Sequence, residues 1–294
     1  MQQGSNPSDI HHFKCIAQGA RGLVTNNFSL PHMKTVVITG STRGLGFGLA
    51  RRFLEKGCSV VVNGTGQGSV ERALSELSSF AGQVHGVAGD ISSKPDVEHL
   101  YREADQRFGP VDIWVNNAGI GQPMAKAWEI PADRLERIAA VNIMGVVHGT
   151  IVPFRAMKAR GSGMIFTMEG HGSSGRIVDC MAMYGTTKSA ATYFTKAFAH
   201  EARGSGVTIG RLLPGMVVTD MLLGTVSGND PENVRRRKFY NLLADDVDTV
   251  SAFLVDGMLA AKGPSPRIEW LTRRKALFRM MFGFLRKRDF FVGD

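Results

Sequence analysis

Tyr184 and Lys188 are the residues of this chain whose types and spacing best suit proton transfer. If Tyr184-Gly185-Thr186-Thr187-Lys188 is helical, the phenol and the ammonium share one face, because positions i and i+4 are neighbours on a helix. An unperturbed Tyr titrates at about 10, and a nearby cation lowers this pKa by favouring the phenolate. A phenol tuned in this way can pass a proton to or from a carbonyl or carbinol oxygen. The spacing alone is weak, so its meaning depends on the elements that position the pair.

Short apolar segments of the chain alternate with longer helical stretches. Fully apolar runs suit strands buried on both faces of a parallel sheet, and the segments between them are long enough for crossover helices. We expect strands at Thr35–Thr39, Val60–Val62, Val84–Ala88, Val111–Val115, Ile165–Met168, Val207–Leu213 and Ile268–Leu271. We expect helices at Leu45–Lys56, Ser69–Phe80, Pro95–Phe108, Ala132–Ala159 and Ala182–Arg203. This alternation predicts an α/β fold with a Rossmann-type doubly wound parallel sheet, as a single domain over residues 33–272 followed by a basic helical tail over residues 273–294.

A glycine-rich turn follows the first expected strand directly. Its sequence is Gly40-Ser41-Thr42-Arg43-Gly44-Leu45-Gly46, and a helix is expected next. Glycines here permit a tight turn and the close approach of a pyrophosphate to the helix N-terminus. We therefore predict that all seven residues belong to a dinucleotide site.

The choice between NAD and NADP is expected to fall at the end of the second strand, Asn63-Gly64-Thr65. An NAD-preferring site would place an acidic residue here to hold the ribose 2′-hydroxyl, and this segment has none. Arg43 could instead reach a 2′-phosphate, with Thr65 and Ser69 as helpers. These features favour NADP(H), and a simply solvated Arg43 is the alternative.

Further polar residues follow the later strands. Asp90 and Ile91 are placed at the adenine edge, through the Asp90 side chain or the adjoining backbone, unless Asp90 only caps a helix. Asn117, Ala118 and Gly119, within Asn116-Asn117-Ala118-Gly119, suit a cofactor crevice at a strand's carboxyl end, although such a tetrapeptide can also be a plain turn. Asn142 needs a polar partner, either structural or a proton-relay water. The last such segment contains Pro214, Gly215, Val217 and Thr219, whose hydroxyl could bind the nicotinamide carboxamide.

Composition narrows the class of protein. The chain has 294 residues, 43% of them hydrophobic, and a net charge of +9. No run of eighteen or more apolar residues is present, so no transmembrane helix is expected. Three scattered cysteines (Cys15, Cys58 and Cys180) show neither metal spacing nor a disulfide framework, which predicts no metal site and a reducing, intracellular compartment. No RNA- or DNA-binding motif accompanies the charge, so nucleic acid is not expected as a partner.

Residues 1–32 differ from the rest of the chain, because they are polar, with little periodicity and no secretory h-region. They are expected to be a flexible extension or the product of a mis-assigned start, with Met33 as the native first residue. Met33 opens directly into the first strand, which favours the second interpretation. The single acidic residue, Asp9, leaves a weak organelle transit peptide as a further alternative.

Together these motifs closely resemble the classical short-chain dehydrogenase/reductase family over about residues 34–225. The resemblance implies that Tyr184 is the catalytic acid/base, that Lys188 lowers its pKa and holds the cofactor ribose, and that Asn142 anchors a proton relay. It implies hydride transfer between a nicotinamide cofactor and a small-molecule carbonyl or alcohol. We also expect a homo-oligomer, either a dimer or a tetramer. A non-catalytic NADP-binding scaffold of the same fold is the rival interpretation.

One departure from the family pattern concerns the hydroxyl that binds the substrate oxygen. The family usually places a Ser about thirteen residues before the Tyr, where this chain has His171. The serine pair expected at the strand end is replaced by Glu169-Gly170. Ser173 is the predicted substitute, Ser174 is the next candidate, and His171 could also polarise a carbonyl.

The same departure resembles the chlorophyll(ide) b reductase branch of the family. The resemblance rests on an acidic-Gly-x-Gly-Ser stretch before the Tyr, on the segment from Pro214 to Leu223, and on Lys238–Leu243. It implies reduction of the 7-formyl group of chlorophyll(ide) b with NADPH. Another lipid, steroid or small alcohol or ketone substrate is the alternative. The implied compartment is the chloroplast for a plant or algal chain, and otherwise the cytoplasm.

The tail from residue 272 to 294 holds seven Lys or Arg against two Asp. An apolar face is expected from Leu277, Phe278, Met281, Phe282 and Leu285. The cations expected to border it are Lys275, Arg279 and Arg286–Arg288. A basic amphipathic helix of this kind suits peripheral membrane contact. Packing over the substrate pocket or a subunit interface is the alternative. Val217–Leu243 is expected to form the substrate lid.

Overall fold

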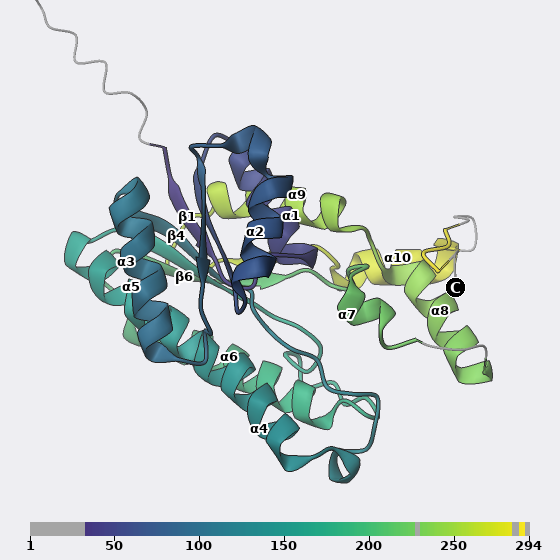
Figure 1. Ribbon diagram of the computed structural model, residues 1–294. Helices are drawn as coiled ribbons and strands as arrows, with labels where there is room; N and C mark the ends of the chain where they lie inside the picture. Colours follow the sequence, from purple (N-terminus) through teal and green to yellow (C-terminus); the bar gives the residue numbers. More distant parts are fainter. Residues whose placement is uncertain (1–32, 227–229, 284–287, 292–294) are drawn as a thin grey trace, which may run out of the picture. The chain divides into compact units, whose positions relative to one another are not determined.

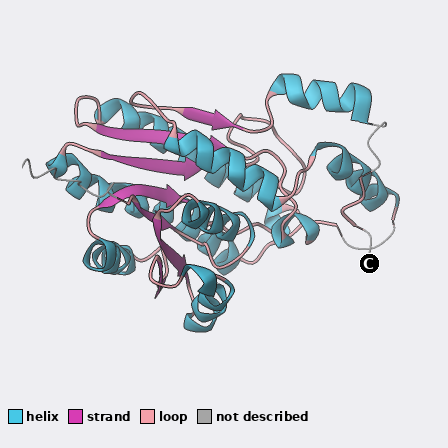
Figure 2. Cartoon of the chain, turned by 90° about the horizontal axis from the view of Figure 1, so that it is seen from above, coloured by secondary structure: helices cyan, strands magenta, loops and turns pink. Residues whose placement is uncertain are grey.

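Seven strands form one sheet, and every hydrogen-bonded strand pair in it is parallel (Figures 1 and 2). The computed structural model describes residues 33–226, 230–283 and 288–291, so the predictions for residues 1–32 lie outside the described part. The strands are β1 (Thr35–Ile38), β2 (Ser59–Gly64), β3 (Val84–Ala88), β4 (Val111–Asn116), β5 (Gly163–Met168), β6 (Val207–Leu213) and β7 (Arg267–Glu269). Their order is β3-β2-β1-β4-β5-β6-β7, which confirms the predicted doubly wound sheet. The strand order reverses at β1 and β4, the point at which such sheets bind ligands.

Helices cover both faces of this sheet because its strands are apolar on both sides. In β1, Val36 and Ile38 enter one hydrophobic cluster, and Val37 enters the other. The first face is covered by α1 (Gly44–Glu55), α2 (Gln67–Glu76) and α9 (Val247–Leu259), and the second by α3 (Lys94–Phe108), α5 (Gly145–Arg160) and α6 (Ala182–Glu201). Burial on both faces therefore explains the continuous apolar runs.

A continuous helical stretch, Ala132–Arg160, connects β4 to β5. It consists of α4 (Ala132–Ala139), a π-helical turn (Ala140–Met144) and α5. The stretch is long and apolar enough to cross a membrane by length and composition alone. Its packing against β4, β5 and α3 accounts for that apolar character, as expected of a crossover helix in a sheet core.

Of the described helices that follow β6, three lie beside the carboxyl end of the sheet, whereas α9 covers its first face. Two of them, α7 (Asp220–Leu223) and α8 (Pro231–Leu243), lie in the predicted lid, and α10 (Arg273–Phe282) packs against α8. The tail prediction was wrong about Arg279, which does not border an exposed face. Its side chain is buried, because it forms an ion pair with Asp245. Leu285, Arg286 and Lys287 lie outside the described residues.

Candidate active site

Tyr184 and Lys188 lie on the first turns of α6, at the carboxyl end of β5. The Lys188 ammonium lies 5.8 Å from the centre of the Tyr184 ring. The same ammonium donates a hydrogen bond to the carbonyl oxygen of Met168, the last residue of β5, at 3.2 Å. Lys188 is buried and Tyr184 is half-buried. The helix therefore brings the two side chains together on one face, as their spacing predicts.

Burial dominates the acidity of this pair. It raises the pKa of Tyr184 to about 12. It also lowers the pKa of Lys188 to about 8, while the negative charge of Glu169 acts in the opposite direction. The pKa of Tyr184 is therefore raised by burial, and the effect expected of Lys188 stays a prediction. Burial has this effect because the charged phenolate loses its hydration.

Asn142 reaches the site from the π-helical turn. Its side-chain oxygen accepts a hydrogen bond from the Ile120 amide at 2.8 Å, and its amide group donates to the Ile120 carbonyl at 2.9 Å and to the Thr187 hydroxyl at 3.1 Å. Thr187 in turn donates to the Tyr184 carbonyl at 2.8 Å. The extra residue of a π turn re-aims the backbone, and such turns are frequent at functional sites. Asn142 thus links the loop after β4 to the helix that carries Tyr184.

Gly170 occupies the place beside Tyr184 where the family pattern expects a side-chain hydroxyl. A Cβ atom at this position would lie 2.9 Å from the Tyr184 hydroxyl oxygen and 3.2 Å from Lys188 Cε. Ser173 Oγ accepts a hydrogen bond from the Gly170 amide at 3.1 Å, and it lies 3.5 Å from the Lys188 carbonyl oxygen. His171 is half-buried, and burial, with a smaller effect of Arg176, lowers its pKa.

Glu169, just before Gly170, is a buried carboxylate beneath this site. Its side chain is paired with Arg211 of β6 at 3.0 Å. Both partners are largely withdrawn from solvent, with side-chain exposures of 5% and 15%. Loss of either charge would leave the other one uncompensated.

Gln122 is a site residue that sequence reasoning missed. Its side chain is buried, and its amide group donates to the Cys180 carbonyl at 2.6 Å, while its oxygen accepts from the Tyr184 amide at 2.8 Å. It therefore caps the first turn of α6 from a distant loop. No local pattern marks it, because its partners lie far away in the sequence.

The glycine turn after β1 fits a pyrophosphate. Gly40 and Gly44 have φ values of +60° and +56°, which favour glycine. A Cβ atom at Gly46 would lie 2.4 Å from both the Asn117 side-chain nitrogen and the Gly40 carbonyl oxygen. Helix α1 begins here without a side-chain cap or an acidic residue in its first turn, so its first amides can face an anion.

Other predicted residues hold this turn in place. The Asn117 amide group donates to the carbonyls of Thr39 and Gly40, each at 2.9 Å, and the Ala118 amide donates to the Thr39 hydroxyl at 3.1 Å. Ser41 is fully buried, and its hydroxyl donates to Ile38 at 2.6 Å. Gly119 lies against Asn142 and Lys188. The structure thus joins the strand ends of β1 and β4 at the predicted crevice.

Ser69, one of the residues predicted near a 2′-phosphate, lies at the end of β2, whereas the Arg43 side chain contacts Asp220. The Arg43 side chain is 81% exposed, and its contact with Asp220, at 3.7 Å, is weak and solvated. Thr42 and Ser69 lie against Gly64, and Thr65 is exposed beside them. These three hydroxyls and one guanidinium are a donor set that suits a phosphate.

The Asp90 side chain has a structural role. Its carboxylate pairs with Arg137 at 2.7 Å and accepts hydrogen bonds from Ser92, and these partners, against the opposing effect of burial, hold its pKa below its usual range. Helix α3 is capped by Ser93, so Asp90 does not cap it. The Ile91 side chain packs against Gly145. The Asp90 carboxylate is therefore already engaged by protein partners.

The loop after β6 meets the glycine turn. A Cβ atom at Gly44 would lie 3.6 Å from the Thr219 methyl carbon, so the two predicted cofactor segments are adjacent. Gly215 has a φ of +74° and lies against Leu271. Val217 is buried in the core, and Pro214 leads the chain out of β6.

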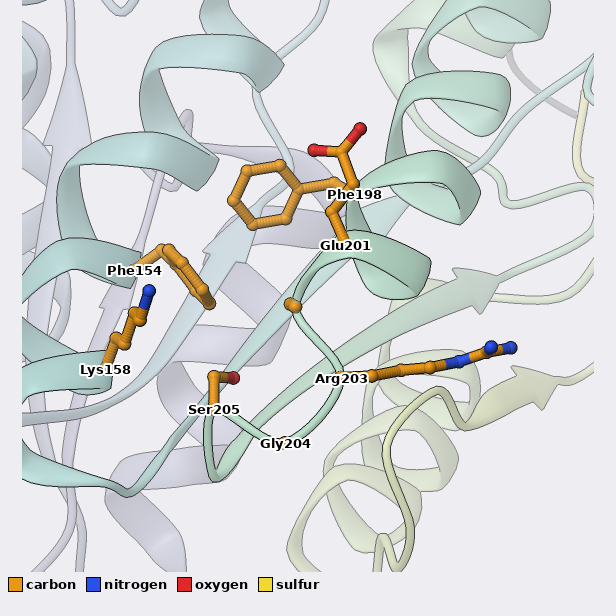
Figure 3. Close-up of a pocket in the computed structure, with 8 residues that line it drawn as sticks. Phe154, Lys158, Phe198, Glu201, Arg203, Gly204 and Ser205 are labelled. Carbon is orange, nitrogen blue, oxygen red and sulfur yellow. The ribbon is translucent and has the colours of Figure 1, made fainter.

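A surface hollow lies well away from these residues (Figure 3). It has a volume of about 220 Å³ and lies between the carboxyl ends of α5 and α6, beside Gly204 and Ser205. Ser205 precedes β6, so the hollow is at the amino edge of the sheet, opposite Tyr184. Ligands of such sheets bind at the carboxyl edge, so this hollow is not the active site. Within the described residues, no three His, Cys, Asp or Glu side chains gather as a metal site.

Comparison with known proteins agrees with this geometry. A model of the short chain dehydrogenase family matches residues 34–229. The chain is 32% identical, over 88% of its length, to a chloroplastic protein of Arabidopsis thaliana named as a probable chlorophyll(ide) b reductase, and it spans 54% of that relative. It is 31% identical over 88% of its length to a chloroplastic chlorophyll(ide) b reductase of Oryza sativa subsp. japonica, and it spans 78% of that protein. The match to the chlorophyll(ide) b reductase branch is thus found in two plants.

Solved structures show the same fold. The 3-ketoacyl-(acyl-carrier-protein) reductase of Brucella melitensis, complexed with NADH, is 28% identical, and the match covers 80% of this chain and 96% of that one with a TM-score of 0.68. Levodione reductase is similar with a TM-score of 0.69 at 24% identity, covering 80% of this chain and 96% of that one, which shows the fold alone.

Proposed function

This chain belongs to the short-chain dehydrogenase family, and we propose that it reduces an aldehyde or ketone with NADPH, with Tyr184 as the proton donor. The observation that carries the proposal is the convergence of Tyr184, Lys188 and Asn142 beside the glycine turn, at the switch point of the sheet. The cofactor would supply a hydride at nicotinamide C4. The donor set of Arg43, Thr65 and Ser69, with no acid at the end of β2, supports NADPH over NADH.

The side chains divide the work of the reaction. The raised pKa of Tyr184 keeps its hydroxyl protonated, so it can donate to the carbonyl oxygen as negative charge develops there. Lys188 is the buried cation beside it, which stabilises the phenolate left after donation and holds the ribose. Asn142 fixes the turn through which a replacement proton would arrive. Ser173 is the proposed hydroxyl partner of the substrate oxygen, because it holds Gly170, which borders the Tyr184 hydroxyl.

We propose the 7-formyl group of chlorophyll(ide) b as the substrate. Support comes from the two plant relatives and from the Glu169-Gly170 pair that replaces the usual serines. Gly170 lets the backbone lie close to the Tyr184 hydroxyl, where a Cβ atom would be only 2.9 Å away. For a chain of plant or algal origin, the chloroplastic relatives support the same compartment. We also propose a homo-oligomer, to be checked by light scattering.

The test measures NADPH oxidation with chlorophyllide b and with a panel of simple aldehydes. We expect formation of the 7-hydroxymethyl product, at least about 1,000-fold slower in Tyr184→Phe because the proton donor is removed. Tyr193→Phe is the matched control, since Tyr193 lies on the same helix and is 76% exposed. Turnover of other carbonyls alone would refute the pigment assignment. Cofactor binding without turnover of any carbonyl would favour a scaffold.

A further inference from the structure

Helix α10 has an unusual distribution of side chains, because it buries a cation and exposes its apolar residues. Phe278 is 62% exposed, whereas its neighbour Arg279 is only 6% exposed. The exposed apolar side chains of the helix, here called the α10 apolar face, are Leu277, Phe278, Met280, Met281 and Phe282. Contiguous exposed apolar surface of this kind marks an interaction site.

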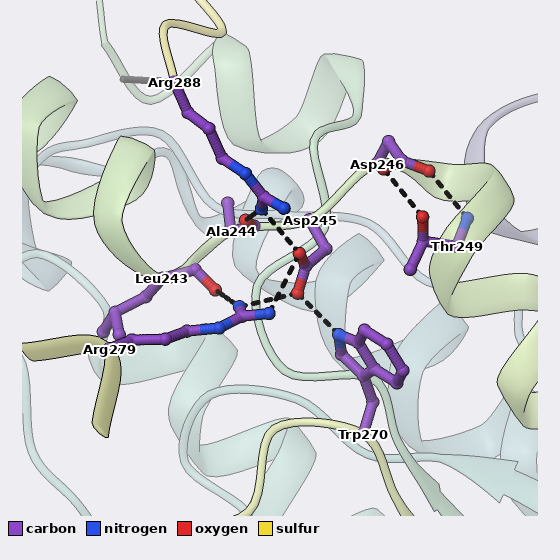
Figure 4. Close-up of polar contacts among 8 residues, drawn as sticks. All are labelled: Leu243, Ala244, Asp245, Asp246, Thr249, Trp270, Arg279 and Arg288. Atoms are coloured by element: carbon purple, nitrogen blue, oxygen red, sulfur yellow. Dashed lines mark hydrogen bonds and ion pairs between the residues drawn. The ribbon is translucent and has the colours of Figure 1, made fainter. Parts of the chain in front are cut away.

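The orientation of α10 is fixed by Asp245 (Figure 4). Arg279 forms two hydrogen bonds with this carboxylate, at 2.6 and 3.1 Å, and a third with the Leu243 carbonyl at 2.9 Å. The Trp270 indole and the Arg288 guanidinium bind the same carboxylate at 2.6 and 2.9 Å. Turning the apolar face inward would leave a buried charge unpaired, which is strongly unfavourable. The α10 apolar face is therefore held outward by the fold.

The charges around this face indicate which partner it suits. Arg273 and Arg274 are exposed in the first turn and neighbour Leu277 and Phe278, four residues on. Every residue of α10 is described, and none is acidic. The Lys275 ammonium lies over the Trp270 ring, on the anchored side. A second copy would bring the same arginines to this face without an acidic partner from α10, which opposes self-association through it.

We propose that α10 is an interfacial helix that seats the protein on an anionic lipid bilayer. The apolar face would enter the boundary between headgroups and acyl chains, and Arg273 and Arg274 would meet lipid phosphates. Asp245, whose carboxylate anchors α10, also contacts the loop after β6 through its backbone. Its amide donates to the Met216 carbonyl, and its backbone carbonyl accepts from the Val218 amide. Docking would thus place the predicted lid and cofactor loop next to the membrane, whatever the substrate is.

The experiment is cosedimentation of the full chain with vesicles. We expect binding to vesicles containing phosphatidylglycerol and much weaker binding to pure phosphatidylcholine vesicles. Phe278→Glu/Met281→Glu should lower the fraction bound at least about tenfold, because two anchors are removed and two like charges face the lipid. Arg273→Gln/Arg274→Gln should weaken binding to the anionic vesicles only. Tyr193→Glu, an exposed aromatic on α6, is the control that should bind as the wild type does.

Thermal unfolding of each variant and light scattering of the lipid-free protein accompany the assay. Unchanged melting is expected, since the substituted side chains are exposed. Three results would overturn the proposal. The first is that the protein binds neither vesicle type, and the second is that wild type and Phe278→Glu/Met281→Glu bind equally. The third is that an oligomer of the wild type is lost in that variant, which would identify a second copy as the partner of the α10 apolar face.

Discussion

A Cβ atom at Gly170 would lie 2.9 Å from the hydroxyl oxygen of Tyr184, closer than real Cβ contacts occur. A side chain at position 170 would therefore have to displace the Tyr184 hydroxyl. The hydroxyl that replaces the serine of the family pattern must come from outside position 170, and Ser173 adjoins that position.

Gly170→Ala tests this relationship directly. We expect kcat to fall about 10- to 100-fold, because the added methyl group displaces the Tyr184 hydroxyl from the reacting oxygen. Gly68→Ala is the matched control, since a Cβ atom there would meet only the end of the Arg72 side chain, at 3.8 Å. An undiminished kcat in Gly170→Ala would show that the tyrosine does not work from this position.

Cofactor affinity should depend on pH through Lys188. Its pKa is lowered to about 8, so the ammonium is charged below that value and neutral above it. Because the charged form favours an anionic ligand, Kd for NADP⁺ should rise as pH increases through this range. Titration by fluorescence on both sides of the pKa measures the effect. Lys188→Met should bind weakly with little pH dependence, and an equally steep dependence in that variant would contradict the assignment.

Glu169 should set where that pH dependence falls. Its charge raises the pKa of Lys188, against the larger effect of burial. In Glu169→Gln this charge is absent, so the pKa of Lys188 should fall. The midpoint of the pH profile for cofactor binding should therefore move to lower pH. The Arg211 charge also loses its partner, which should lower the free energy of unfolding by roughly 1–3 kcal/mol. Glu71→Gln, on the exposed face of α2, should change neither property.

Arg43 should decide the preference for NADPH. We expect Arg43→Ala to raise KM for NADPH about tenfold and to leave KM for NADH nearly unchanged, because only the 2′-phosphate contact is lost. Arg51→Ala, a surface change further along α1, is the control. If both cofactors lose affinity equally, Arg43 contacts the pyrophosphate rather than the 2′-phosphate.

Removal of the buried Asp245 carboxylate should strongly destabilise the folded protein. Asp245→Ala leaves Arg279 buried without its partner, and we expect a loss of about 3–5 kcal/mol in urea unfolding. Asp256→Ala, which removes an exposed partner of Lys56, should cost less than about 1 kcal/mol. Equal losses would show that the buried pair is not what anchors α10.

Low pH should reproduce part of the loss of stability expected in Asp245→Ala. Despite the opposing effect of burial, hydrogen bonds from Arg279, Arg288 and Trp270 lower the pKa of Asp245. A carboxyl whose folded pKa is depressed stabilises the protein above its unfolded pKa, and this contribution is lost as pH falls through the folded value. The difference in stability between wild type and Asp245→Ala should therefore narrow in acid.

The sequence by itself determined the strands, the helices between β1 and β6, the glycine turn and the Tyr184–Lys188 pair, but not α7, α8 and α9. These features follow from local rules, because a strand buried on both faces reads as an apolar run and a helix brings i and i+4 together. The carboxyl ends of parallel strands share one edge, so the motifs that come after them could be assigned to one crevice from their order alone.

Only the tertiary structure decided which groups touch across distant segments. Three such contacts join residues far apart in the chain. Gln122 caps the helix of Tyr184, Gly170 lies against the Tyr184 hydroxyl, and Arg279 is buried against Asp245. Periodicity along α10 predicted that its cations lie outward. The buried carboxylate reversed this for Arg279, because pairing a buried charge outweighs covering the exposed apolar side chains of a surface helix.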